Sequence, residues 1–299
     1  MNDEVYDKYK LAGKITAKAR DFGVSLLKPG ASFLEVADKI ESKILEKGGS
    51  LAFPVNISVN EIAAHFSPKH DDDLVFKKDD VVKLDIGAHV DGFIADTAVT
   101  VEIGNNNYSK MIKASSDALD AAIKILKAGI NLYEIGKIVQ KTINSYGFKP
   151  IGNLTGHSMQ RFILHAGMSV PNIPDEMYNG KPKDGDVLAI EPFATNGAGH
   201  VVSGPGSNIY LCKNSIKKLM IRDKEAKLIF EKIKNEFKTL PFAQRWFKRQ
   251  FTYSEISLRK LSFVGLLKHY PQLIDAKKGI VTQKEHTVIV TEEGCEVIT

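Results

Sequence analysis

The sequence is poor in cysteine, with only Cys212 and Cys295 among its 299 residues. A disulfide framework is therefore not expected, and a reducing cytoplasm is the natural compartment for the chain. The two cysteines form no CxxC pair, so a metal would have to be held by histidine and carboxylate side chains. Long apolar runs are also missing, since no stretch approaches the roughly 18 residues of a membrane span. The polar start, MNDEVYDKYK, lacks the basic and then apolar pattern of a signal peptide.

Neither sign of charge is in large excess, because the formal net charge is only +5. The charge is unevenly placed, however. Residues 213–268 contain 15 lysines or arginines against five acidic residues, and the rest of the chain is net acidic. A basic block in an acidic remainder indicates either an inserted unit or a surface that meets an anionic partner.

Two stretches of the chain are similar at an offset of 99 residues: KPGASFLEVADKIESKILEKGG from residue 28 and KAGINLYEIGKIVQKTINSYGF from residue 127. Each predicts a helix with apolar residues at helical spacing, preceded by a further helix near residues 5–27 or 108–127. Both share a capping-box pair and a terminal glycine: Ser32, Glu35 and Gly48 in one copy, Asn131, Glu134 and Gly147 in the other.

After each helix pair, an apolar strand runs into a carboxylate, in DVVKLD ending at Asp85 and in DVLAIE ending at Glu191. Two copies of helix, helix and strand predict an internally duplicated α+β domain with approximate twofold symmetry. Such symmetry would bring Asp85 and Glu191 to the same central place. Helix–strand patterns also recur by chance, but the agreement of caps, glycines and apolar positions at one offset favours duplication.

The segment VVKLDIGAHVDGFIADTAVTV, residues 81–101, predicts a β-hairpin with its turn near residues 90–92. Depending on which two residues form the loop, Asp96 lies directly opposite Asp85 or is its diagonal neighbour on the same face. Two ionised carboxylates on an apolar strand pair repel each other and lose hydration unless a cation intervenes. A divalent metal resolves this conflict. The alternative is that one of the two faces solvent or caps a turn.

Three further donors occur at strand ends or turns. His157 lies in TGHS, Glu191 is followed by Pro192, and Glu285 opens the strand EHTVIV. Proline helps to end the hydrogen bonding of a strand. Taken alone, each donor is more often a surface or turn residue than a metal ligand.

The segments LDIGAHVDGFIADTAVT, GHSM, AIEPFAT and KEHTVIV resemble, in order and spacing, the metal-binding segments of the methionine aminopeptidases. These enzymes belong to the pita-bread metallopeptidases, and the resemblance runs from about residue 5 to the C-terminus. It implies an internally duplicated pita-bread fold and two divalent metal ions, cobalt, manganese, iron or zinc. It also implies five ligands for these ions: Asp85, Asp96, His157, Glu191 and Glu285.

The resemblance assigns roles to other residues as well. His65 matches the imidazole that contacts the scissile amide, and His165 matches the one that steadies the substrate carbonyl. Glu191 matches the base that takes the proton of the nucleophile. The nucleophile is a hydroxide shared by the two ions, and it attacks the first peptide carbonyl. The residues that match the methionine side-chain pocket are Phe53, Phe193 and Ile209.

The long interval between Glu191 and Glu285, with its basic insert, resembles the type II branch, whose insert is winged-helix-like. A catalytic domain of residues 1–199 and 276–299 and a helical inserted subdomain of residues 200–275 are expected. No long charged extension precedes the helical repeat, so the archaeal type is the nearer match. The implied activity is removal of the initiator methionine from nascent polypeptides whose second residue is small, by a cytoplasmic monomer that binds neither membrane nor DNA.

Two alternatives stay open. An X-prolyl aminopeptidase or prolidase would share the five ligands, although such relatives usually carry a sizeable domain ahead of the catalytic one. A non-enzymatic RNA- or ribosome-binding protein on the same fold would lose metal ligands, and all five positions are intact here. The aromatic and basic run RWFKR within the insert motivates the further hypothesis that the insert contacts the ribosome near the nascent chain.

Overall fold

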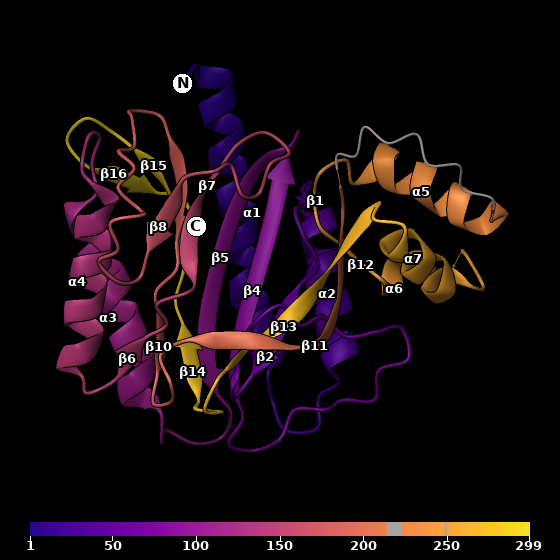
Figure 1. Ribbon diagram of the computed structural model, residues 1–299, viewed down its shortest axis with the longest axis horizontal. Helices are drawn as coiled ribbons and strands as arrows, with labels where there is room; N and C mark the ends of the chain where they lie inside the picture. Colours follow the sequence, from indigo (N-terminus) through magenta and orange to yellow (C-terminus); the bar gives the residue numbers. More distant parts are fainter. Residues whose placement is uncertain (214–222, 249) are drawn as a thin grey trace.

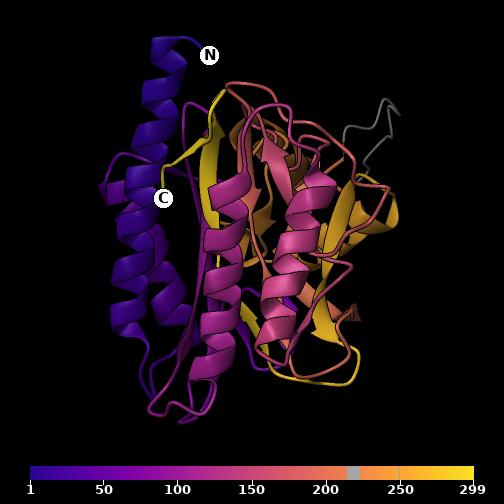
Figure 2. The same ribbon diagram turned by 90° about the vertical axis from the view of Figure 1, so that its left-hand side faces the viewer.

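Each half of the chain begins with a pair of packed helices, as the repeat predicts. The computed structural model describes residues 1–213, 223–248 and 250–299 (Figure 1). The four helices are α1 (Asp3–Leu26) and α2 (Phe33–Glu46) in the first half, and α3 (Ser109–Ile125) and α4 (Leu132–Ser145) in the second. Figure 2 shows α3 and α4 side by side across one face of the molecule, with α1 along its edge.

The ends of the two repeated helices follow from local sequence. At the start of α2, Ser32 Oγ accepts a hydrogen bond from the Glu35 N–H at 3.4 Å. At the start of α4, Asn131 Oδ1 accepts from the Tyr133 N–H at 3.0 Å, one residue earlier than the capping-box spacing predicts. Both helices end at a glycine in the left-handed region, with φ of +82° at residue 48 and +83° at residue 147.

The strands of the described residues form four small sheets. The first-half sheet contains β1 (Ser50–Leu51), β2 (Asn56–Val59), β4 (Val81–Val90) and β5 (Phe93–Glu102). The second half contains the sheet β16 (Cys295–Val297), β15 (His286–Val290), β9 (Val187–Ile190), β7 (Thr155–Met159) and β8 (Ser169–Pro171), and the sheet β14 (Val281–Gln283), β10 (Phe193–Thr195) and β6 (Lys149–Pro150). The fourth sheet contains β12 (Phe242–Ala243), β11 (Val201–Cys212), β13 (Leu267–Asp275) and β3 (Ile62–Ala64).

Strand pairing repeats between the halves with the same register. Leu51 pairs with Ala88 in the first half, and Pro150 pairs with Ala194 in the second. Leu51 and Pro150 are 99 residues apart in sequence, and Ala88 and Ala194 are 106 apart. The strand-end residues Asp85 and Glu191 are also 106 residues apart. Duplication therefore extends from the helices into the sheets.

Helices and sheets bury a separate apolar core in each half. The first core includes Ile40 and Ile44 of α2 with Leu84 and Ile86 of β4. The second includes residues of α3 and α4 with strands β8, β9 and β15. In the described part of the chain, no helix is both long and apolar enough to cross a membrane.

The insert begins and ends in strands that the sequence did not predict. β11 and β13 pair along their length, and β13 also pairs with β3 of the first half. Gly204, Pro205 and Gly206 interrupt the strand pattern of β11, and Pro271 interrupts that of β13. Register shifts accompany these residues, because proline cannot donate a ladder hydrogen bond and glycine favours bulges.

The remaining helices, α5 (Lys224–Glu236), α6 (Arg245–Lys248) and α7 (Ser254–Phe263), lie together beyond the β11–β13 pair (Figure 1). They share a small core of their own that includes Ile229, Phe247 and Leu258. Part of the basic block, residues 214–222, lies outside the described residues. The domain limits at residues 200 and 275 and the winged-helix interpretation stay predictions.

Candidate metal centre and active site

The β4–β5 hairpin brings Asp85 and Asp96 together. Val90 pairs with Phe93, so the loop is Asp91 and Gly92, both with positive φ (+52° and +89°), as a type I′ turn requires. Asp85 then pairs with Ala98 and Asp96 with Gly87. The two carboxylates are diagonal neighbours on one face, which is the second of the two registers open from the sequence.

The second half supplies three further donors to the same place. His157 lies on β7, paired with Ala189 of β9. Glu191 directly follows β9, and Glu285 directly precedes β15. The Gln283 side-chain amide donates to Glu191 Oε2 at 3.3 Å, which orients this carboxylate.

Backbone contacts join the halves beside these donors. The Glu285 N–H donates to the Ala98 carbonyl at 3.0 Å, and Thr97 Oγ1 donates to the Glu285 carbonyl at 2.8 Å. The Asp96 N–H donates to Thr287 Oγ1 at 2.8 Å. Glu285 is thus held against the strand that carries Asp96.

The five expected ligands line one cavity. Asp96, His157 and Glu285 each offer a donor atom within 4.8 Å of the others. His157 Nε2 lies 3.7 Å from Asp96 Oδ2 and 3.8 Å from Glu191 Oε1. The lining of this cavity also includes Asp85, with the expected site residues Phe53, His65, His165 and Ile209.

The electrostatics of the cavity favour a bound cation. Asp85 Oδ1, Asp96 Oδ1 and Glu285 Oε2 are buried and have no hydrogen-bond partner among the described residues. Burial raises the pKa of Asp85 to about 7. Burial and the repulsion of neighbouring carboxylates also hold the pKa values of Asp96, Glu191 and Glu285 well above their usual range. Buried carboxylate oxygens that face one another without a hydrogen-bond donor are suitable ligands for divalent metal ions, since hard cations prefer oxygen ligands.

His157 is suited to complete such a site. Burial is the main cause that lowers its pKa, to about 3, so the imidazole is neutral near pH 7. A neutral imidazole forms no ion pair with the nearby carboxylates but keeps a lone pair for a metal. The donor set is thus four carboxylates and one nitrogen, without sulfur.

His65 and His165 lie beside the carboxylate cluster. The His165 ring centroid is 4.4 Å from that of His157, and burial is the first cause that lowers its pKa. Burial likewise lowers the pKa of His65, to about 4, with smaller contributions from His165 and Lys268. Both imidazoles are therefore neutral near pH 7 and can donate a hydrogen bond without carrying charge.

The expected pocket residue Phe193 lies elsewhere. It is 1% exposed and packs with Ile151, Val201 and Val281 in a separate apolar cluster. Among the described residues, the cavity lining does not include it. Pro192 separates β9 from β10, so Phe193 belongs to the next strand and pairs with Gln283. Its placement in the methionine pocket is not supported by this geometry.

Other cavity-lining residues were missed from the sequence: Asn56, Ala64, Leu164, Pro241 and Tyr270. Asn56 pairs directly with Asp85 across β2 and β4. Tyr270 comes from β13 of the insert, and its ring meets that of His65 edge-on with centroids 5.2 Å apart. No local sequence signal marks Pro241 and Tyr270, because their position depends on how the insert folds back onto the first half.

Comparison with known proteins identifies the family of the chain. Residues 7–292 match metallopeptidase family M24. A methionine aminopeptidase from Methanocaldococcus jannaschii is 48% identical over 299 residues, which cover 100% of both chains. Among solved structures, a thermophilic Arx1 has a TM-score of 0.85 at 17% identity, covering 100% of this chain and 91% of its own. A methionine aminopeptidase from Thermotoga maritima has a TM-score of 0.73 at 23% identity, covering 100% of this chain and 98% of its own.

The structural similarities establish the fold, and the match across the chain establishes the class. The chain belongs to metallopeptidase family M24, with the pita-bread fold that the family resemblance implies. Within this family it is an enzyme of the methionine aminopeptidase group, in line with its full-length relative at 48% identity. The family resemblance inferred from the sequence is confirmed.

Proposed function

We propose that the enzyme removes the initiator methionine from nascent polypeptides whose second residue is small, with two divalent ions at the five-ligand site. The observation that carries this proposal is the convergence of buried, unpaired carboxylate oxygens on one cavity that also holds two neutral imidazoles. The donor set suits manganese, iron or cobalt at least as well as zinc.

Divalent ions held by Asp85, Asp96, His157, Glu191 and Glu285 would polarise the scissile carbonyl and lower the pKa of a water toward neutrality. Glu191 is the proposed base, because burial and the charge of Asp85 raise its pKa and favour acceptance of a proton. The Gln283 amide keeps this carboxylate oriented while the proton moves.

The two imidazoles act on the substrate. His165 donates a hydrogen bond to the carbonyl oxygen as negative charge develops there. His65 contacts the scissile amide and its leaving nitrogen. Both remain neutral near pH 7 since burial lowers their pKa values.

The cavity is complementary to a free chain end. A substrate α-ammonium carries the charge that the acidic lining attracts, whereas a blocked amine does not. Phe53 and Ile209, both buried, supply apolar surface for the methionine side chain. This arrangement favours cleavage after the first residue.

The basic insert is the part of the chain expected to contact a partner. Contact of this insert with the ribosome, close to emerging nascent chains, stays a prediction, as do a cytoplasmic location and a monomeric state. The charge excess of residues 213–268 is the observation that motivates the contact.

A peptide panel tests the proposed activity. Peptides beginning Met-Gly and Met-Ala are expected to lose methionine, Xaa-Pro peptides to remain intact, and chelation to abolish cleavage until manganese, iron, cobalt or zinc is restored. Liberated amino acid is measured by mass spectrometry. Cleavage confined to Xaa-Pro bonds would support the prolidase alternative, and no cleavage with any of these metals would support a non-enzymatic role.

A further inference from the structure

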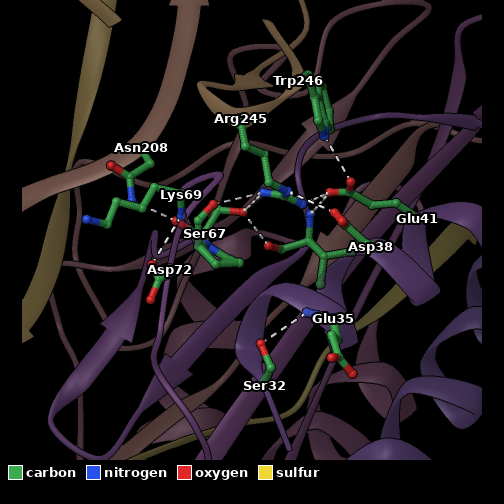
Figure 3. Close-up of polar contacts among 12 residues, drawn as sticks. Ser32, Glu35, Asp38, Glu41, Ser67, Lys69, Asp72, Asn208, Arg245 and Trp246 are labelled. Atoms are coloured by element: carbon green, nitrogen blue, oxygen red, sulfur yellow. Dashed lines mark hydrogen bonds and ion pairs between the residues drawn. The ribbon is translucent and has the colours of Figure 1, made fainter. Parts of the chain in front are cut away.

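A buried arginine of the insert reaches into the first half of the catalytic fold. Arg245 is 4% exposed, and its guanidinium forms an ion pair with the Glu41 carboxylate of α2. Its Nη1 also donates to Ser67 Oγ at 2.7 Å and to the Pro68 carbonyl at 3.3 Å. Nε lies 3.3 Å from Asp38 Oδ1. Figure 3 shows this guanidinium between the two acidic side chains and Ser67.

The partners of Arg245 hold a particular stretch of backbone. Glu41 accepts a hydrogen bond from the Val55 N–H at 3.2 Å, and Ser67 Oγ donates to the Val55 carbonyl at 2.8 Å. The polar groups of Val55 are therefore fixed by the same two side chains that bind Arg245. Trp246 Nε1 adds a hydrogen bond to Glu41 at 2.9 Å, again from the insert.

The stretch fixed in this way carries part of the active site. Residues 53–67 include Phe53 and His65, which line the cavity. His65 has a φ of +62°, in the left-handed region that residues with a side chain adopt infrequently and at some cost in free energy. Ser67 lies two residues after His65, and its backbone is held in turn by Ser207 and Asn208 at 3.1 and 2.9 Å.

We propose that Arg245 is a positioning residue: the insert sets the place of the His65 imidazole through Glu41 and Ser67. A buried ion pair adds little net stability compared with apolar residues of the same volume, so its presence calls for another account. A planar guanidinium can bind a carboxylate, a hydroxyl and a carbonyl at once in fixed directions, which lysine cannot do. The insert thereby contributes to catalysis without touching the substrate through this residue.

The test is a double-mutant cycle on kcat and KM with a Met-Gly peptide. Arg245→Met is expected to lower kcat by about 20-fold with KM changed less than about threefold, since small misplacements of a catalytic group cost up to about a hundredfold. In a His65→Ala background, the same substitution is expected to change kcat by less than about twofold. Bound metal per chain is expected to be equal in all variants.

Two further variants separate positioning from folding. Arg245→Lys should retain part of kcat, because its ammonium can reach Glu41 but not Ser67 and Pro68 together. If Arg245→Met does not fold, the double variant Glu41→Gln/Arg245→Met takes its place in the cycle. This variant removes both charges of the buried pair, so neither is left without its partner. Leu119→Ala, in the α3–α4 core of the second half and outside the insert, is the control for lost stability, with kcat expected at the wild-type value.

The inference rests on the proposed role of His65, and the outcomes distinguish the two. If His65→Ala keeps the wild-type kcat, the role of His65 fails and this inference with it. If His65→Ala is impaired but Arg245→Met lowers kcat by the same factor in both backgrounds, only the positioning role is overturned. An equal loss of kcat in Leu119→Ala would overturn it as well.

Discussion

Replacing Asp96 with asparagine is expected to lower kcat/KM on a Met-Gly peptide by well over about 100-fold, the upper range for residues that merely support a metal ligand. Asp96 lies within 4.8 Å of His157 and Glu285 through its donor atoms and is 3% exposed. Asparagine keeps the shape but removes the negative charge, so bound metal per chain is expected to fall too. Peptide kinetics and elemental analysis of the purified protein measure both effects.

Asp91→Asn is the matched control in the same hairpin. Asp91 lies at the turn with φ of +52°, which asparagine tolerates, and its exposed carboxylate pairs with Lys8 at 3.0 Å. An exposed pair of this kind contributes little stability, so activity is expected to stay within about twofold of wild type. Cleavage by Asp96→Asn that is unchanged and resists chelator would refute the metal assignment.

Three of the five expected ligands, Asp85, Asp96 and Glu191, could be placed together from the residues alone, through the duplication and the hairpin. Asp85 and Glu191 occupy corresponding positions, and the hairpin register makes Asp96 a neighbour of Asp85. Lys83 and Ala189 correspond, because they are 106 residues apart like Asp85 and Glu191. Ser58 pairs with Lys83 and His157 pairs with Ala189, so His157 corresponds to Ser58. The partner half therefore gives no hint that a ligand stands at residue 157.

Glu285 shows the same limit. Leu84 pairs with Val99 in the first half and Ile190 pairs with His286 in the second, so Glu285 corresponds to Ala98. Symmetry in the backbone does not carry over to these side chains. Only the family resemblance placed His157 and Glu285 in the site.

The contribution of the insert could not be predicted because it depends on contacts distant in sequence. Tyr270 meets the His65 ring where β13 pairs with β3, a pairing that proline conceals in the pattern of β13. Arg245 contacts Ser67 from α6 of the insert, 178 residues further along the chain. Conversely, only the family resemblance placed Phe193 in the pocket. In the structure it lies on β10, after Pro192, and packs in another apolar cluster.

The four site carboxylates are expected to destabilise the metal-free protein as the pH rises, in contrast to the paired carboxylates of ordinary proteins. Burial raises the pKa of Asp85 to about 7, and burial together with like charges holds the pKa values of Asp96, Glu191 and Glu285 well above their usual range. An unfolded carboxyl titrates near 4, so the folded state binds more protons above that pH. Stability from these groups is therefore present below pH ~4 and is lost as the pH rises through the folded pKa values.

The buried histidines act in the opposite direction over part of this range. The pKa values of His157 and His65 are lowered to about 3 and 4, so the unfolded state binds more protons there below its own pKa near 6.5. Above pH 6.5 the histidine contribution is constant. The buried Lys83, whose pKa burial lowers to about 7, adds stability as the pH rises above 7, but it is common to chelated and metal-loaded protein. From pH 6.5 upward, the difference in stability between these two forms therefore reports the carboxylates.

Chelation should accordingly lower Tm by about 10 °C or more at pH 8 and by less at pH 6.5, since metal binding stabilises the fold and offsets the repulsion. Differential scanning calorimetry of chelated and metal-loaded protein measures the difference. In chelated protein at pH 8, Asp96→Asn should raise Tm above that of wild type because one of the repelling charges is gone. The same substitution would thus remove activity and stabilise the metal-free fold, an opposition expected only where carboxylates are held together for a cation. A Tm of chelated Asp96→Asn below that of chelated wild type would contradict it.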